Sequence, residues 1–135
     1  MKKIIIVIGL FLLILFGYKY PYILLCEYQN NAPNNLSFDY QKPNSDGGKS
    51  FTPYVESKNW KHDNTFFVEI VIPANCGDYY WLGSYHIVKN NLRLEYKALS
   101  DGVMPCGACP VHLFYTIEGI EKQEYNITIS SGIPD

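Results

Sequence analysis

An alternation of apolar and polar residues in the second half of the chain constrains its fold more than any other feature. Residues 92–97 alternate at every position, and between residues 66 and 72 apolar side chains recur at every second position around Glu69. Successive side chains of a β-strand point to opposite faces, so this period predicts strands with one buried face. Further strands are expected at residues 83–88, 111–117 and 125–129, with turns at residues 89–91 and at Gly119.

Strands that are separated by turns every ~8–12 residues are typical of antiparallel sandwiches and small barrels. We expect Pro73 to end the strand before it, because proline cannot donate to a ladder. Two shorter stretches, residues 36–40 and 52–57, are candidate strands in a segment rich in Asn, Pro, Ser and Gly. The chain is therefore predicted to be mainly β, with a small antiparallel β-sandwich or partly open barrel preceded by an N-terminal apolar helix.

The first 25 residues combine a charged start with an apolar run. Lys2 and Lys3 are followed by thirteen residues without a polar or charged side chain, and the apolar segment that begins at Ile4 can be extended to Leu25. The extended segment reaches the roughly 20 residues that a helix needs to cross a bilayer. The basic start predicts that the N-terminus stays inside. We expect residues 4–25 to be a membrane anchor, with the C-terminal domain outside the cytoplasm at the cell envelope.

Two alternatives for this segment stay open. A cleaved signal peptide has the same charged start and an apolar core of about 7–15 residues, and it would leave a secreted or periplasmic protein. No pair of small residues suited to cleavage follows Phe16, however. Cys26 lies at a suitable distance for lipidation, although Leu24 and Leu25 are bulkier than the residues expected before such a cysteine. In all three cases the cysteines lie in an oxidising compartment.

Composition and charge divide the chain into three parts. We expect residues 1–25 to be the anchor or signal segment, residues 26–64 a polar tether in which short strands are possible, and residues 65–135 the antiparallel β domain. Without the three lysines of the leader, eight basic residues face thirteen acidic ones, a net charge of about −5. Because phosphate contacts need clustered Lys and Arg, nucleic acid is not expected as a partner.

Cys76, Cys106 and Cys109 form the constellation with the most chemistry. If residues 66–72 pair antiparallel with residues 111–117, the end of the first strand lies beside the start of the second. Cys76 then comes close to both other cysteines. We expect Cys76 to form a disulfide with Cys106 or Cys109, closing a loop of about 30 residues that contributes roughly 3–4 kcal/mol in the chain-entropy model. The remaining cysteine would pair with Cys26, stay free or bond another chain.

A metal site is a second interpretation of the same cysteines. Cys106 and Cys109 have the spacing of a zinc knuckle, Cys76 would be a third thiolate, and His112 or His86 would complete the coordination. His112, however, is expected on the opposite face of its strand from Cys109.

Thiol–disulfide exchange is a third interpretation. The segment Cys106-Gly107-Ala108-Cys109 resembles the dithiol motif of thioredoxin-type oxidoreductases. In that family the first thiolate is stabilised at a helix N-terminus. The residues that follow here predict a strand instead, so that stabilisation would be missing.

Tyr79, Tyr80 and Trp81 form a run of aromatic residues. Consecutive side chains of a strand alternate between faces, so at least one of the three is expected to be exposed. Exposed aromatic side chains contribute much of the binding energy in protein interfaces. The run therefore predicts either a protein-binding hot spot or a hydrophobic lid over the edge of the sandwich.

Conventional catalytic patterns are weak in this chain. Ser84 follows Gly83 without the nucleophile-elbow motif, and the three histidines form no zinc-protease pattern. We expect no enzyme and no cofactor, and instead a non-catalytic role in binding a protein partner or as an envelope accessory. The alternative is a metal-binding or thiol-redox protein that works through Cys76, Cys106 and Cys109.

Overall fold

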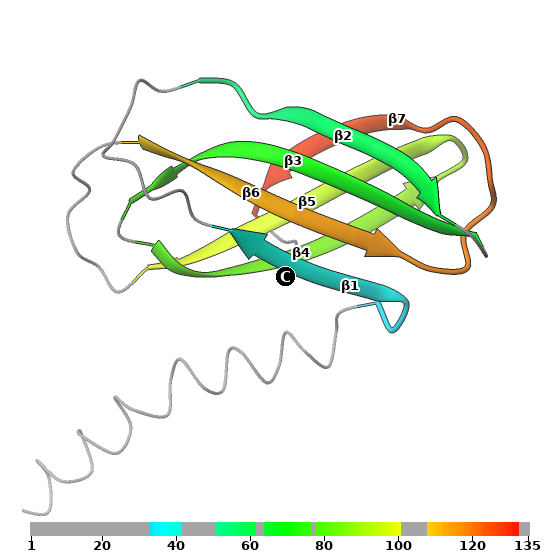
Figure 1. Ribbon diagram of the computed structural model, residues 1–135, viewed down its shortest axis with the longest axis horizontal. Helices are drawn as coiled ribbons and strands as arrows, with labels where there is room; N and C mark the ends of the chain where they lie inside the picture. Colours follow the sequence, from blue (N-terminus) through cyan, green and yellow to red (C-terminus); the bar gives the residue numbers. More distant parts are fainter. Residues whose placement is uncertain (1–32, 42–50, 62–63, 77, 101–107, 133–135) are drawn as a thin grey trace, which may run out of the picture. The chain divides into compact units, whose positions relative to one another are not determined.

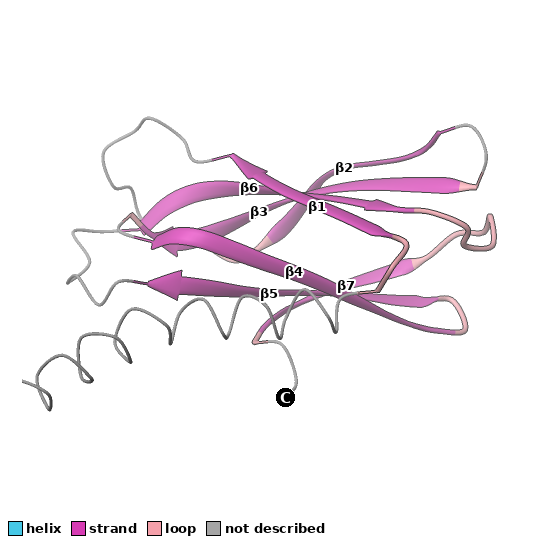
Figure 2. Cartoon of the chain, turned by 90° about the horizontal axis from the view of Figure 1, so that it is seen from below, coloured by secondary structure: helices cyan, strands magenta, loops and turns pink. Residues whose placement is uncertain are grey.

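The computed structural model describes residues 33–41, 51–61, 64–76, 78–100 and 108–132. These residues form two sheets that pack as a β-sandwich, seen as two layers in Figure 2. Sheet A has the strand order β1-β6-β3-β2 and sheet B the order β4-β5-β7 (Figure 1). The strands are β1 (Leu36–Gln41), β2 (Tyr54–Lys61), β3 (Thr65–Asn75), β4 (Asp78–Val88), β5 (Asn91–Ser100), β6 (Ala108–Ile117) and β7 (Asn126–Ser131).

The predicted mainly β sandwich is confirmed for these ranges. The apolar helix expected before it lies outside them, as do Cys26 and Cys106. Within the described ranges no helix is long and apolar enough to cross a membrane. The compact unit begins at Pro33. Strands β1 and β2, from the segment expected to be a polar tether, are therefore part of sheet A.

The core lies between the two sheets and is built from the alternating apolar positions that the sequence marks. Strands β3 and β6 pair antiparallel, with Ile72 opposite Val111 and Phe66 opposite Ile117. Their inward side chains are almost fully buried, and Leu92 and Leu94 of β5 face them from sheet B. The buried residues of the core are Phe66, Val68, Ile70, Ile72, Ala74, Trp81, Leu92, Leu94, Val111, Leu113, Tyr115, Ile117, Ile120 and Tyr125.

The expectation that Pro73 ends its strand is wrong, because β3 continues to Asn75. Strand β2 pairs with β3 only as far as Tyr54 opposite Val71, so β3 has a single neighbour at Pro73. That neighbour presents Pro110. Two prolines that face each other fit a pair of residues that exchanges no hydrogen bonds, so the missing N–H groups cost no ladder bond.

The expectation of a purely antiparallel fold is also incomplete, because β7 pairs parallel with β5. Between these strands the chain crosses to sheet A as β6 and returns, and each crossing reverses its direction. The parallel ladder is extended at both ends by backbone hydrogen bonds, from Asn126 N to Asn90 O at 2.8 Å and from Gly132 N to Tyr96 O at 2.8 Å.

One side of the sandwich is closed by contacts between β1 and β4. The ring of Phe38 lies directly against Gly83, in the space that a Cβ atom at position 83 would occupy. Further along the same two strands the Tyr85 hydroxyl donates to Asn35 Oδ1 at 2.6 Å, and Asn35 Nδ2 donates to Glu118 O at 2.7 Å. Asn35 therefore joins the start of β1 to β4 and to the end of β6.

Candidate functional site

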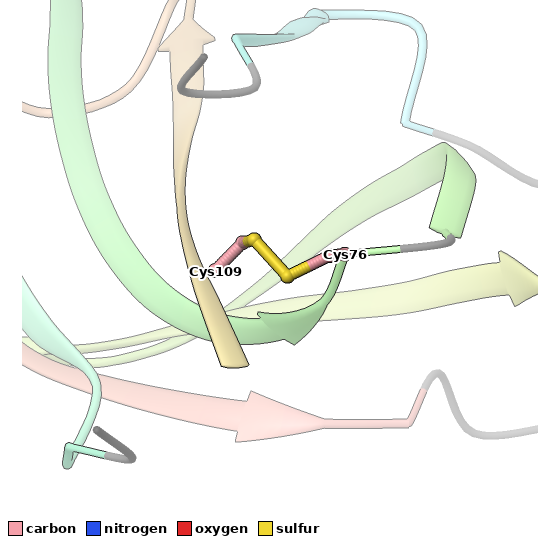
Figure 3. The surroundings of a disulfide bond; sticks show 2 residues. All are labelled: Cys76 and Cys109. Carbon is pink, nitrogen blue, oxygen red and sulfur yellow. A yellow bond between two sulfur atoms is a disulfide. The ribbon is translucent and has the colours of Figure 1, made fainter. Parts of the chain in front are cut away.

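A disulfide joins Cys76, just past the end of β3, to Cys109 on β6 (Figure 3). The register places Cys109 opposite Ala74. Cys76 follows Ala74 by two positions, so it is the diagonal neighbour of Cys109 on the same inward face. The two Cα atoms are 5.2 Å apart, within the usual range for a disulfide. The predicted bond from Cys76 is thus confirmed, with Cys109 as the partner. It encloses the whole β4–β5 hairpin in a loop with a sequence separation of 33.

The bond bears on the metal and redox interpretations. While it is intact, Cys76 and Cys109 cannot supply thiolates to a metal ion, and Cys109 is bonded to Cys76 rather than to Cys106. His112 points to the other face of β6, as the alternation predicted, and its Nδ1 lies 2.8 Å from Glu69 Oε1. Among the described residues no group of three metal-ligating side chains is found. A disulfide is typical of proteins from oxidising, extracytoplasmic compartments.

The aromatic run at the start of β4 is divided between the surface and the core. Tyr80 is 57% exposed, in agreement with the expectation that at least one of these rings is exposed. Trp81 is only 4% exposed, and its ring packs 6.1 Å from that of Tyr96. Its position in the core argues against a surface role for Trp81. The side chain of Tyr79 lies outside the described set.

Exposed Tyr80 lies near Tyr40 of the neighbouring strand β1. Burial raises the pKa of Tyr40 above its ordinary value, with smaller contributions from Tyr80 and Asp39. The pair is part of the contact that closes this side of the sandwich. It offers no catalytic arrangement.

The outer side of sheet A carries an apolar and aromatic surface that we call the aromatic face. Its members are Tyr54, Phe67, His112 and Phe114, and the register puts them on one side of β2, β3 and β6. Phe114 stacks on Phe67 with ring centroids 6.2 Å apart and on His112 at 6.4 Å. Tyr54 is 48% exposed. Solvent faces of antiparallel sheets are usually polar, so this composition is unusual.

Polar partners surround these rings and order them. Glu69 accepts from Ser57 Oγ at 3.1 Å and pairs with His112 at 2.8 Å, so both of its carboxylate oxygens are used. Lys61 Nζ lies 4.9 Å above the ring of Phe67, a distance suited to a cation–π interaction. An aromatic centre with a polar, charged border is the composition found in protein interfaces.

The outer side of sheet B has the opposite character. Ser84, Glu95 and Ser130 lie side by side across its three strands. Arg93 Nε is 3.0 Å from Glu95 Oε1, and Arg93 Nη2 donates to Ser130 Oγ at 3.2 Å. Arg93 therefore has partners in both Glu95 and Ser130, and Glu95 is itself only 5% exposed. The two faces of the sandwich are therefore chemically different.

The aromatic face is not predicted by the alternation of β3. The alternation places Phe66, Val68, Ile70 and Ile72 on the inward side and marks the outer side by Glu69 alone. Phe67 and Val71 flank Glu69 on that same side, and Val71 is only 2% exposed. The signal available in the sequence was a central strand that is apolar on both sides, which is common where both faces are covered.

No protein family model matches the chain, and neither a curated protein nor a solved structure does. Any function must therefore be argued from the molecule itself.

Proposed function

We propose that this chain is an exported domain, held at the cell envelope by an anchor at residues 4–25, that binds a protein partner through its aromatic face. The observation that carries the proposal is the difference between the two outer sheet surfaces. On sheet B the exposed Arg93 is paired with the nearly buried Glu95 and with Ser130, whereas sheet A presents stacked Phe67 and Phe114. Apolar patches with polar borders on a soluble domain mark sites where other molecules bind.

The ordering of the aromatic face supports binding to a partner rather than random exposure. Phe114 is held between Phe67 and His112, and His112 is held by Glu69. Rings that are fixed before association lose little conformational entropy when a partner covers them. Aromatic side chains also supply most of the strongest contacts in interfaces.

Support for the compartment and the anchor comes from other parts of the chain. The Cys76–Cys109 bond fits an oxidising environment outside the cytoplasm. The apolar leader, with Lys2 and Lys3 before it, fits a segment that keeps the N-terminus inside. Together they support a domain that acts outside the membrane to which it is attached.

Site-specific photo-crosslinking in the cells that make the protein tests this proposal. A photoreactive residue replaces Thr116, which lies opposite Phe67 on sheet A, or Thr128, which lies opposite Arg93 on sheet B. We expect one discrete adduct from position 116 and none from position 128. The adduct should disappear in a Phe67→Ser, Phe114→Ser variant that keeps the far-UV circular dichroism of the original protein.

The mass of the adduct identifies the partner. An adduct of twice the chain mass would mean that a second copy of this chain is the partner. Equal crosslinking from positions 116 and 128, or adducts that persist in the double variant, would contradict a role for the aromatic face.

A further inference from the structure

A pocket of about 370 Å³ lies between the end of β2 and the connection that leads to β7. Its floor consists of Trp60, Phe66 and Tyr125. The Trp60 ring lies 4.7 Å from that of Phe66, and Tyr125 is 5.8 Å from Phe66 and 6.3 Å from Trp60. The volume is within the range of small-molecule sites, about 300–1,000 Å³.

The floor presents ring surfaces rather than hydrogen-bonding groups. The hydroxyl of Tyr125 is already used, because it donates to Glu121 O at 2.8 Å. Phe66 and Tyr125 are 3% and 4% exposed, so they support the floor from behind. The half-buried Trp60 ring offers the surface on which a flat apolar group can stack.

The rim of the pocket is polar and comes from two segments that are distant in the sequence. Strand β2 contributes Lys58 and Asn59, and the connection before β7 contributes Lys122, Gln123 and Glu124. The lining residues thus include two lysines and one glutamate, in a chain whose overall charge is −2. This local excess of positive charge complements an anion.

We propose that this pocket binds a small organic anion that carries one planar apolar group, of the class of aromatic carboxylates. The planar group lies on Trp60, and the carboxylate lies between Lys58 and Lys122. This site is separate from the aromatic face and does not depend on the function proposed for it.

Nuclear magnetic resonance of the full-length ¹⁵N-labelled protein tests the proposal with 1-naphthoate as the probe. The chain has two tryptophans, so two indole N–H signals report binding. We expect 1-naphthoate to shift the Trp60 signal in a saturable manner and to leave that of buried Trp81 nearly unchanged. The uncharged analogue 1-naphthylmethanol should bind about fivefold more weakly, because it lacks the charge that the two lysines attract.

Variants at the rim separate charge recognition from non-specific binding to an apolar surface. A Lys58→Gln, Lys122→Gln protein should lose about fivefold in affinity for 1-naphthoate and none for 1-naphthylmethanol. Lys97→Gln, a matched change on the outer face of sheet B, should bind both probes as the original does. The proposal would be overturned if the Trp60 indole signal did not shift at a 1-naphthoate concentration of roughly 10 mM, which would detect even weak binding. The proposal would also be overturned if 1-naphthoate and 1-naphthylmethanol bound with equal affinity and the Lys58→Gln, Lys122→Gln variant bound both as the original protein does.

Discussion

Reduction of the Cys76–Cys109 bond should lower the free energy of unfolding by a predictable amount. The bond closes a loop with a separation of 33 residues. In the chain-entropy model such a cross-link removes about 12 cal/mol/K from the unfolded ensemble, or about 3.7 kcal/mol at 25 °C. That is a large share of the roughly 5–15 kcal/mol by which a domain of this kind is stable. The expected loss therefore brings the sandwich close to its stability limit.

The measurement compares oxidised and reduced forms of one protein by urea unfolding. The protein carries Cys26→Ser and Cys106→Ser, so that the Cys76–Cys109 bond is the one that reduction breaks. Cys76 and Cys109 themselves are kept, so the comparison leaves the packing of their side chains unaltered in composition. With a urea slope of ~1.5–2 kcal/mol/M, the unfolding midpoint should fall by about 2 M and the slope should rise, because the unfolded chain becomes less compact. A change of less than about 1 kcal/mol, with both thiols shown to be free, would refute the entropic argument.

Three further predictions concern packing and burial. Gly83→Ala places a methyl group in the space of the Phe38 ring and should lower the free energy of unfolding by about 1–3 kcal/mol. In a Phe38→Ala background the same change should cost much less, and a double-mutant cycle measured by urea unfolding tests this. Trp81→Ala should lower the free energy of unfolding by about 3–5 kcal/mol. Trp81→Phe should lower it far less, because the buried indole Nε1 has no hydrogen-bond partner among the described residues. Equal losses of stability for the two variants in urea unfolding would contradict this reasoning. Burial raises the pKa of Tyr96, so the unfolded chain releases that proton first and stability should fall as pH rises through about 10. Tyr96→Phe should reduce this alkaline decline in thermal unfolding, and an unchanged decline would contradict it.

Much of the fold could be predicted from the period of the apolar residues. The sequence pattern located the five strands from β3 to β7, and the antiparallel pairing of β3 with β6, assumed in the sequence analysis, is confirmed. That pairing was sufficient to place Cys76 beside the start of β6. The alternation already puts Cys109 on the inward face with Val111, and the register, which places Cys109 opposite Ala74, brings it within bonding distance of Cys76.

The remaining features depend on tertiary context that a local pattern does not contain. Pro73 continues its strand because β2 has already ended and Pro110 lies opposite, and neither fact is visible near Pro73 in the sequence. The parallel direction of β7 results from two crossings between the sheets.

The aromatic face leaves little signal in the sequence for a related reason. The run of three aromatic residues draws the prediction of a binding surface or lid to Trp81, which the structure places in the core. Phe67 and Phe114 are 47 positions apart in the sequence and become neighbours only when β3 pairs with β6. A surface assembled from single residues of different strands leaves no continuous signal.

Hydroxyl-radical footprinting of the unaltered protein tests most directly whether a partner covers the aromatic face. Oxidation of Tyr54, Phe67 and Phe114 is measured by mass spectrometry in intact cells and in the purified protein, with the exposed ring of Tyr80 as reference. We predict that the three aromatic-face residues are protected in cells relative to the purified protein, while Tyr80 is labelled equally in both. Equal labelling of the aromatic face in the two samples would contradict the account.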